Sequence, residues 1–202
     1  MPADPGSGRT DAFAPVTSSH AEAVLACRRQ QTHPNDCGPF AAAAVITGLT
    51  GQQIVAEELA QALDRPRGRG LWGLLPLVRR VPRFATFPWG VVDALRLHGL
   101  EARWQAGMSP EDLVEHLAEG DLLVPIIGRW LPKPWAHYMV LLAHNPAIGW
   151  GFADPASRYD SLRWYPAEDF LPKWRNMGRM AVIISTAERD RAGGGGPGGG
   201  LE

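Results

Sequence analysis

The sequence of 202 residues carries a formal net charge of −1 and 45% hydrophobic residues, so it can bury one substantial core and lacks the basic excess of a nucleic-acid-binding protein. Its two cysteines, Cys27 and Cys37, are too few for a disulfide framework or a zinc cluster and fit a reducing compartment. Residues 1–20 contain no secretion signal, and no apolar run is long enough to cross a bilayer. We therefore expect a cytoplasmic protein without a membrane span.

Three segments differ in composition. Residues 1–22 are small, polar and Pro-containing, which predicts a flexible N-terminal lead-in. Residues 23–187 contain the periodic apolar patterns and predict one folded domain. Residues 188–202 are dominated by glycine and predict a disordered tail.

The first strong helix signal follows the sequence Asp36-Cys37-Gly38-Pro39. Pro34 and Asn35 interrupt regular structure, and the alanine-rich run from Phe40 favours a helix, so Cys37 is expected in its first turn. Cys27 lies in a short, strand-like approach to this helix and reads as a half-buried bystander. A second helix is expected from Gln52 to Leu63, with Thr50 as its N-cap.

The segment from Asp64 to Trp89 is rich in loop-forming residues and basic side chains. It interleaves Gly, Pro and aromatic residues with Arg65, Arg67, Arg69, Arg79, Arg80 and Arg83. Such a segment can face an acidic or extended ligand, or it can be a solvated surface, since arginines usually lie outside. The solvated surface is the favoured interpretation.

The second half of the sequence predicts helices followed by an antiparallel sheet. Helices are expected at 89–98, at 110–119 behind the capping residue Ser109, and briefly at 166–170. Strands are expected at 100–105, 122–127, 137–143, 148–154, 163–165 and 180–185, with a hairpin turn at Asn145-Pro146. The run from Leu122 to Ile127 is continuously apolar, which indicates a strand buried on both faces.

Cys37 is the candidate nucleophile. Unpaired N–H groups and the dipole of a helix N-terminus stabilise a thiolate, which is the reactive form of cysteine. The alternative is a buried structural thiol, because free cysteine is among the most buried residue types. The choice depends on whether the rest of the sequence supplies a base.

His137 is the candidate base, because it opens a buried strand after a Pro- and Trp-containing loop and can project from a rigid sheet end. Of the others, His33 lies in a flexible turn, His98 and His116 are expected on exposed helix positions, and His144 lies by the hairpin turn at the opposite end of the strand. If the hairpin turn is centred between Asn145 and Pro146, residues whose numbers sum to 291 face each other, which pairs His137 with Asp154. A turn centred one residue later pairs Asp154 with Met139 and leaves His137 diagonal to it. Either register lets Asp154 orient the imidazole, whereas the alternative for Asp154-Pro155 is a simple turn.

The motifs occur in an order that resembles the C39-like cysteine peptidases. They are Gln31, Asp36-Cys37-Gly38-Pro39, Gly120 before Val124-Pro125-Ile126, His137-Tyr138 and Asp154-Pro155. The resemblance implies an α+β, papain-like fold, in which an N-terminal helical part with the catalytic cysteine at a helix start packs on a C-terminal antiparallel β-sheet.

The resemblance also implies roles for individual residues. Cys37 is then the nucleophile, His137 the base and acid, and Asp154 the residue that orients His137. Gln31 is the oxyanion-hole donor, with Gln30 as the alternative if the register differs by one residue. Such thiol chemistry needs no cofactor or metal.

Substrate contacts are expected from Trp135 and Asp36, which lie beside the proposed catalytic residues, and Trp150 is a further aromatic candidate. The expected activity is cleavage of a peptide or amide bond through a Cys-His-Asp triad and an acyl-enzyme. The substrate is a peptide or protein, or a small amide or thioester. The same triad also serves acyl transfer and deamidation, and a papain-like binding module without catalysis is the remaining alternative.

Overall fold

The computed structural model describes residues 14–68 and 76–186. The helices are α1 (Ala21–Cys27), α2 (Cys37–Thr50), α3 (Ala56–Asp64), α4 (Pro88–Leu97), α5 (Pro110–Ala118) and α6 (Ala167–Asn176). The strands are β1 (Val16–Thr17), β2 (Arg67–Gly68), β3 (Pro76–Leu77), β4 (Arg80–Val81), β5 (Ala85–Thr86), β6 (Glu101–Gln105), β7 (Leu122–Arg129), β8 (Trp135–Tyr138), β9 (Val140–Asn145), β10 (Gly149–Ala153), β11 (Arg163–Tyr165) and β12 (Ala181–Ser185). In these residues no helix is both long and apolar enough to span a membrane.

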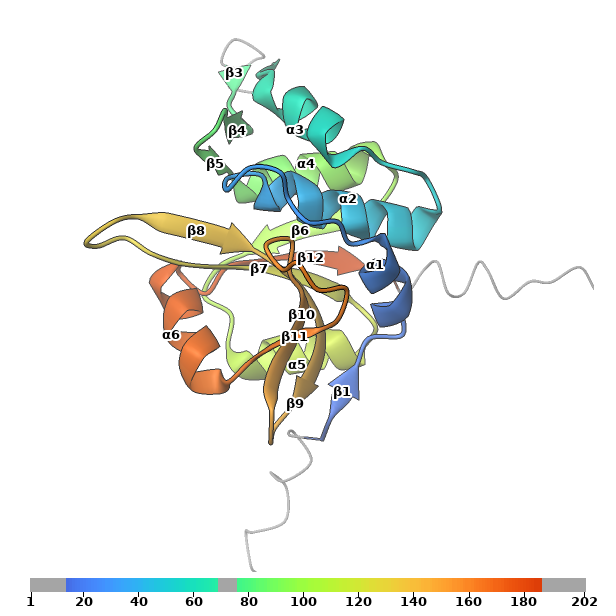
Figure 1. Ribbon diagram of the computed structural model, residues 1–202, viewed down its shortest axis with the longest axis vertical. Coiled ribbons are helices and arrows are strands. Elements are labelled where there is room, and N and C mark those ends of the chain that lie inside the picture. Colours follow the sequence, from blue (N-terminus) through green and yellow to red (C-terminus); the bar gives the residue numbers. More distant parts are fainter. Residues whose placement is uncertain (1–13, 69–75, 187–202) are drawn as a thin grey trace, which may run out of the picture.

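The main sheet has the strand order β11-β10-β9-β7-β12-β6, with β1 added to β9 and β8 added to β7. The pairings between its strands are antiparallel. Helices α2, α3 and α4 lie on one side of the sheet, and α5 and α6 lie on the other (Figure 1). The α+β prediction, with helices packed on an antiparallel sheet, is confirmed.

The apolar run in β7 explains why the sheet is covered on both faces. Alternate side chains point to opposite faces of a strand. Leu122, Val124 and Ile126 accordingly join the cluster formed with α2 and α4. Leu123 and Ile127 join the cluster formed with Leu113 and Leu117 of α5 and with Phe170 and Trp174 of α6.

The helix boundaries correct the sequence expectations in the N-terminal half. Cys27 ends a helix rather than lying in a strand-like approach. Helix α2 continues to Thr50 and ends at Gly51, whose φ of 73° is readily adopted by glycine. Thr50 donates its hydroxyl to the Ile46 carbonyl and accepts the Gln52 amide, so it closes α2 instead of capping the next helix. Helix α3 begins only at Ala56.

Two further expectations change at the sheet. The predicted strand 137–143 is divided at Met139 into β8, which pairs with β7, and β9, which pairs chiefly with β10. Part of the predicted lead-in is ordered, because Val16 pairs with His144 and Thr17 with Ala143. The remaining lead-in, residues 1–13, and the predicted tail from 188 lie outside the described residues.

Candidate active site

Cys37 is the first residue of α2, and only 5% of its surface is exposed. The helix start lies tightly against β5, because a Cβ on Gly38 would come within 2.9 Å of the Thr86 Cβ. Glycine at this position therefore allows the close approach. Tyr138 in β8 strengthens the same junction by donating its hydroxyl to the Thr86 carbonyl at 2.8 Å.

Asp36 immediately precedes Cys37, and its carboxylate is buried rather than open to a substrate. It forms an ion pair with Arg80, which is equally buried and also contacts Asp64 at 2.6 Å. Asp36 makes no side-chain capping bond to α2. The expected substrate contact of Asp36 is thus replaced by an ion pair that ties the helix start to β4 and to the end of α3.

Arg79 and Arg80, at the centre of the basic segment, neither face a ligand nor lie on a solvated surface, because both are buried. Arg79 is buried and pairs with Asp93 at 2.8 Å, while also donating to the carbonyls of Ala62 and Arg65. Together with Arg80, it therefore holds α3, α4 and the β4–β5 hairpin together from within. Arg69 lies outside the described residues.

His137 and Asp154 meet through a hydrogen bond of 2.7 Å between Nε2 and Oδ1. His137 lies in β8 opposite Ile127 of β7, so the direct cross-strand pairing with Asp154 is wrong. The hairpin register instead pairs Ala153 with Val140, which brings Asp154 level with Met139, as in the alternative register. The imidazole in β8 reaches Asp154, which directly follows β10, across the break at Met139.

Asp154 is fully buried, and four donors satisfy its carboxylate. Oδ1 accepts from His137 and from the Ala156 amide, while Oδ2 accepts from Arg163 at 2.8 Å and from the Tyr165 hydroxyl at 3.2 Å. Burial alone would raise the pKa of Asp154, but the contacts with His137, Ala156 and Arg163 lower it to about 2. The carboxylate is therefore ionised and fixed in direction.

The pKa of His137 is raised, whereas that of Asp154 is lowered. Burial lowers the pKa of its imidazole, but the hydrogen bond to Asp154 and the proximity of Cys37 raise it to about 9. Since Nε2 is held by Asp154, Nδ1 is the ring nitrogen left for Cys37. The imidazole therefore lies between the carboxylate of Asp154 and the side chain of Cys37, and both contacts favour its protonated form.

Gln31 is held next to the Asp154-Pro155 turn, because its backbone N–H donates to the Pro155 carbonyl at 2.8 Å. Its side-chain amide donates to the His33 carbonyl at 2.9 Å, and its Oε1 is buried without a hydrogen-bond partner in the described part of the chain. The hydrogen bonds of this amide thus do not include Cys37. Gln30, the alternative donor, is exposed.

Sequence reasoning missed three residues that shape the Asp154 environment. Arg163 and Tyr165 reach Asp154 from β11, and their spacing of two places both side chains on one face of that strand. Arg28 is buried and donates Nη1 to the carbonyls of Asp154 and Ser157. The expected strand at 163–165, which pairs with β10 beside Asp154, was the available signal for the first two, whereas nothing in the sequence indicates Arg28.

The two candidate tryptophans lie in different environments. Trp135, at the start of β8, is 39% exposed and lies two residues before His137. Trp150 is buried and packs against His144 and Phe170 in the cluster with α5 and α6. A substrate contact is therefore compatible with Trp135 and not with Trp150.

Possible metal ligands gather elsewhere. In residues 14–68 and 76–186, the atoms of His116, Glu119 and Asp121 lie within 4.8 Å of one another at the end of α5. His116 and Asp121 already share a hydrogen bond of 2.8 Å. This cluster belongs to the α5–β7 connection and not to the Cys37 region.

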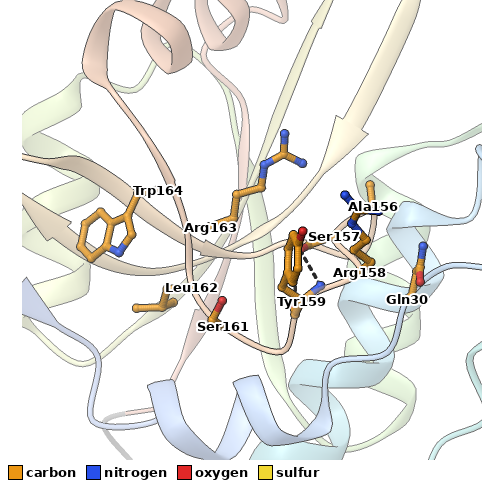
Figure 2. Close-up of a pocket in the computed structure, with 9 residues that line it drawn as sticks. All are labelled: Gln30, Ala156, Ser157, Arg158, Tyr159, Ser161, Leu162, Arg163 and Trp164. Atoms are coloured by element: carbon orange, nitrogen blue, oxygen red, sulfur yellow. Dashed lines mark hydrogen bonds between the residues drawn. The ribbon is translucent and has the colours of Figure 1, made fainter.

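A cavity of about 540 Å³ lies beside Asp154. Figure 2 shows the side chains around it, which come from the segment after β10, from β11 and from Gln30. Ala156 and Arg163 connect the cavity to the catalytic candidates, because both also donate to Asp154.

The fold is similar to that of a solved structure from Bacillus anthracis, provisionally described as a C39-like peptidase. The TM-score is 0.60 at 16% sequence identity, and the similarity covers 85% of this chain and 98% of the other. No protein-family model and no curated protein sequence matches this chain. The structural similarity supports the predicted fold resemblance and leaves the chemistry to be argued from the residues.

Proposed function

We propose that the protein is a cysteine-dependent hydrolase that cleaves a peptide or amide bond. The observation that carries this proposal is the hydrogen bond between His137 and the buried Asp154, beside a cysteine that begins a helix. The provisional description of the structural neighbour as a C39-like peptidase favours the same class of reaction. The expected substrate is a peptide or protein segment.

The reaction follows from these three side chains. The Cys37 thiolate attacks the carbonyl carbon of the scissile bond and forms a tetrahedral oxyanion. His137 gives its proton to the leaving amine as the carbon–nitrogen bond breaks, which yields a thioester with Cys37 and a neutral imidazole. His137 then takes a proton from water, whose oxygen attacks the thioester, and the carboxylic acid leaves as Cys37 is released. Asp154 holds the imidazole in direction throughout.

The oxyanion requires hydrogen-bond donors, for which the backbone N–H of Cys37 and the side-chain amide of Gln31 are the candidates. The Gln31 amide has two N–H groups, one of which is directed at the His33 carbonyl. The second remains for a substrate oxyanion. Gln31→Ala is therefore expected to slow acylation by about a hundred-fold while leaving alkylation of Cys37 unchanged.

Alkylation by iodoacetamide at neutral pH tests the activated thiol, with Cys27 as an internal control. Cys27 is half-buried whereas Cys37 is buried, so exposure alone predicts faster labelling of Cys27. We expect Cys37 to react faster because its partner is His137, and His137→Ala to reverse the order. Peptide mass spectrometry measures both rates. Faster labelling of Cys27 in the wild-type protein would contradict the proposal.

Acyl-enzyme formation separates catalysis from a non-catalytic binding module. Wild-type protein incubated with cell extract and quenched in acid should carry an acyl group on Cys37, and Cys37→Ala should carry none. The mass of the adduct identifies the acyl donor. Adding an amine nucleophile then distinguishes hydrolysis, which gives a carboxylic acid, from acyl transfer, which gives an amide. A binding module would give no adduct with either form.

A further inference from the structure

The cavity beside Asp154 combines cationic, hydroxyl and aromatic groups and lacks acidic ones. Its lining consists of Gln30, Ala156, Ser157, Arg158, Tyr159, Ser161, Leu162, Arg163 and Trp164. In Figure 2, Tyr159 stands between Arg163 and Gln30, with Trp164 on the opposite side of the cavity. The lining residues therefore include two cationic groups and no acidic one.

The neighbouring charges do not cancel the two arginines. Asp160, the nearest acid in the lining segment, is already paired with Arg28 at 2.5 Å. Asp154 engages Arg163 only through Nη1 and is shared with the cationic His137. Because a guanidinium offers five N–H donors, Arg163 keeps donors for a ligand, and its side chain is 48% exposed. Arg158 is exposed, with its guanidinium carbon 5.1 Å from the centre of the Tyr159 ring.

We propose that this cavity binds an acidic side chain of an extended peptide substrate, with its carboxylate between Arg158 and Arg163. This substrate class rests on the proposed function, because the cavity would recognise a peptide whose scissile bond lies at Cys37. Arg163 contacts Asp154 directly, and Gln30 adjoins Gln31. A peptide that reaches Cys37 with an Asp or Glu in the cavity is thus held at two points.

The size and chemistry of the cavity favour a peptide side chain over a polyanion. A volume of about 540 Å³ lies within the range of small-ligand sites and leaves room for an acidic side chain with its neighbouring backbone. Guanidinium groups recognise carboxylates through paired hydrogen bonds, and the Tyr159 and Trp164 rings supply apolar walls for the methylene groups of Asp or Glu. A nucleic acid would require a longer basic surface than two arginines provide.

Selection from a peptide pool tests the proposal without requiring turnover. Full-length Cys37→Ala protein is incubated with an equimolar pool of acetylated, amidated octapeptides with randomised positions, and bound peptides are sequenced by mass spectrometry. We expect Asp and Glu to be enriched about two- to five-fold over Asn and Gln, the range that exposed charge pairs give, and less so at high salt. A second pool with free C-terminal carboxylates distinguishes side chains from chain ends.

Arg158 provides the decisive variant because the proposed mechanism does not use it. Arg158→Gln should reduce the enrichment by at least half, because only Arg163 then remains to hold the carboxylate, and Arg158→Lys should retain most of it. Arg103→Gln is the matched control, since this exposed arginine lies on β6 at the opposite edge of the sheet order from β11. Thermal unfolding confirms that the variants are folded.

Three results would overturn the proposal. They are a pool without acidic enrichment, equal losses in Arg158→Gln and Arg103→Gln, and enrichment that depends on the free C-terminus instead of a side chain. The selection measures binding to a protein without the thiol, so its outcome is independent of acyl-enzyme formation. Failure of either experiment therefore leaves the other interpretable.

Discussion

Replacing Asp154 by Asn tests whether its carboxylate controls the charge of His137. In the wild-type protein the pKa of His137 rises from 6.5 to about 9, although burial by itself lowers it. At 1.36 kcal/mol per pKa unit, the rise corresponds to about 3 kcal/mol in favour of the imidazolium. The amide of Asp154→Asn keeps the shape of the carboxylate but removes its charge. We therefore expect the pKa of His137 to fall clearly below about 9.

Histidine ring resonances in ¹H–¹⁵N spectra, followed between about pH 5 and pH 10, measure this change. Asp160→Asn is the control, because Asp160 lies in the same loop and is 90% exposed while contacting Arg28 rather than His137. It should leave the pKa of His137 unchanged. If Asp154→Asn leaves that pKa near 9, or if both variants lower it equally, the Asp154 contact is not its cause.

The pair also predicts how stability depends on pH. The folded-state pKa of His137 is raised, so its contribution is complete below pH 6.5 and is lost as pH rises through about 9. The pKa of Asp154 is lowered from 3.8 to about 2, so its contribution is complete above pH 3.8 and is lost as pH falls toward about 2. Urea unfolding at neutral and alkaline pH should show a larger alkaline loss in the wild-type protein than in Asp154→Asn. Equal losses would contradict the assignment.

Two further substitutions test the start of α2. Arg80→Leu leaves the buried Asp36 without its partner and should lower the free energy of unfolding by about 3–5 kcal/mol, with part recovered in Arg80→Leu combined with Asp36→Asn. Urea denaturation checks this, and a loss of less than about 1 kcal/mol would contradict a buried pair. Gly38→Ala places a Cβ 2.9 Å from the Thr86 Cβ, so it should destabilise by about 1–3 kcal/mol despite the better helix propensity of alanine. A melting temperature at or above that of the wild-type protein would show that the structure around Thr86 relaxes to accept the new Cβ.

Local patterns were sufficient to predict many of the elements. Ser109 forms the expected capping structure, in which its hydroxyl accepts from Asp112 and the Asp112 carboxylate accepts from its amide. The apolar run from Leu122 yields a strand buried on both faces because its alternating side chains need cover on each side. Both features are set by residues that are close in the sequence, so they can be recognised from one sequence alone.

Long-range partners were not predictable in the same way. Nothing in the sequence around Arg79 and Arg80 indicates that these two arginines are buried. Their partners are Asp36, Asp64 and Asp93, which come close only after α2, α3 and α4 pack. Hairpin arithmetic brought His137 and Asp154 together in principle but could not locate the register shift between Gly151 and Phe152. It also could not reveal the break at Met139, which moves His137 onto a strand paired with β7.

The contact of Arg28 with the Asp154 carbonyl joins residues 126 positions apart in the chain. Contacts of such long sequence separation form late in folding, because the intervening chain must first lose its freedom. During synthesis, the segment with Cys37 emerges well before β8 and β10. Under the proposed function, Cys37 at the start of α2 therefore has no activating partner until the C-terminal half of the sheet has formed, and its reactivity would report complete folding.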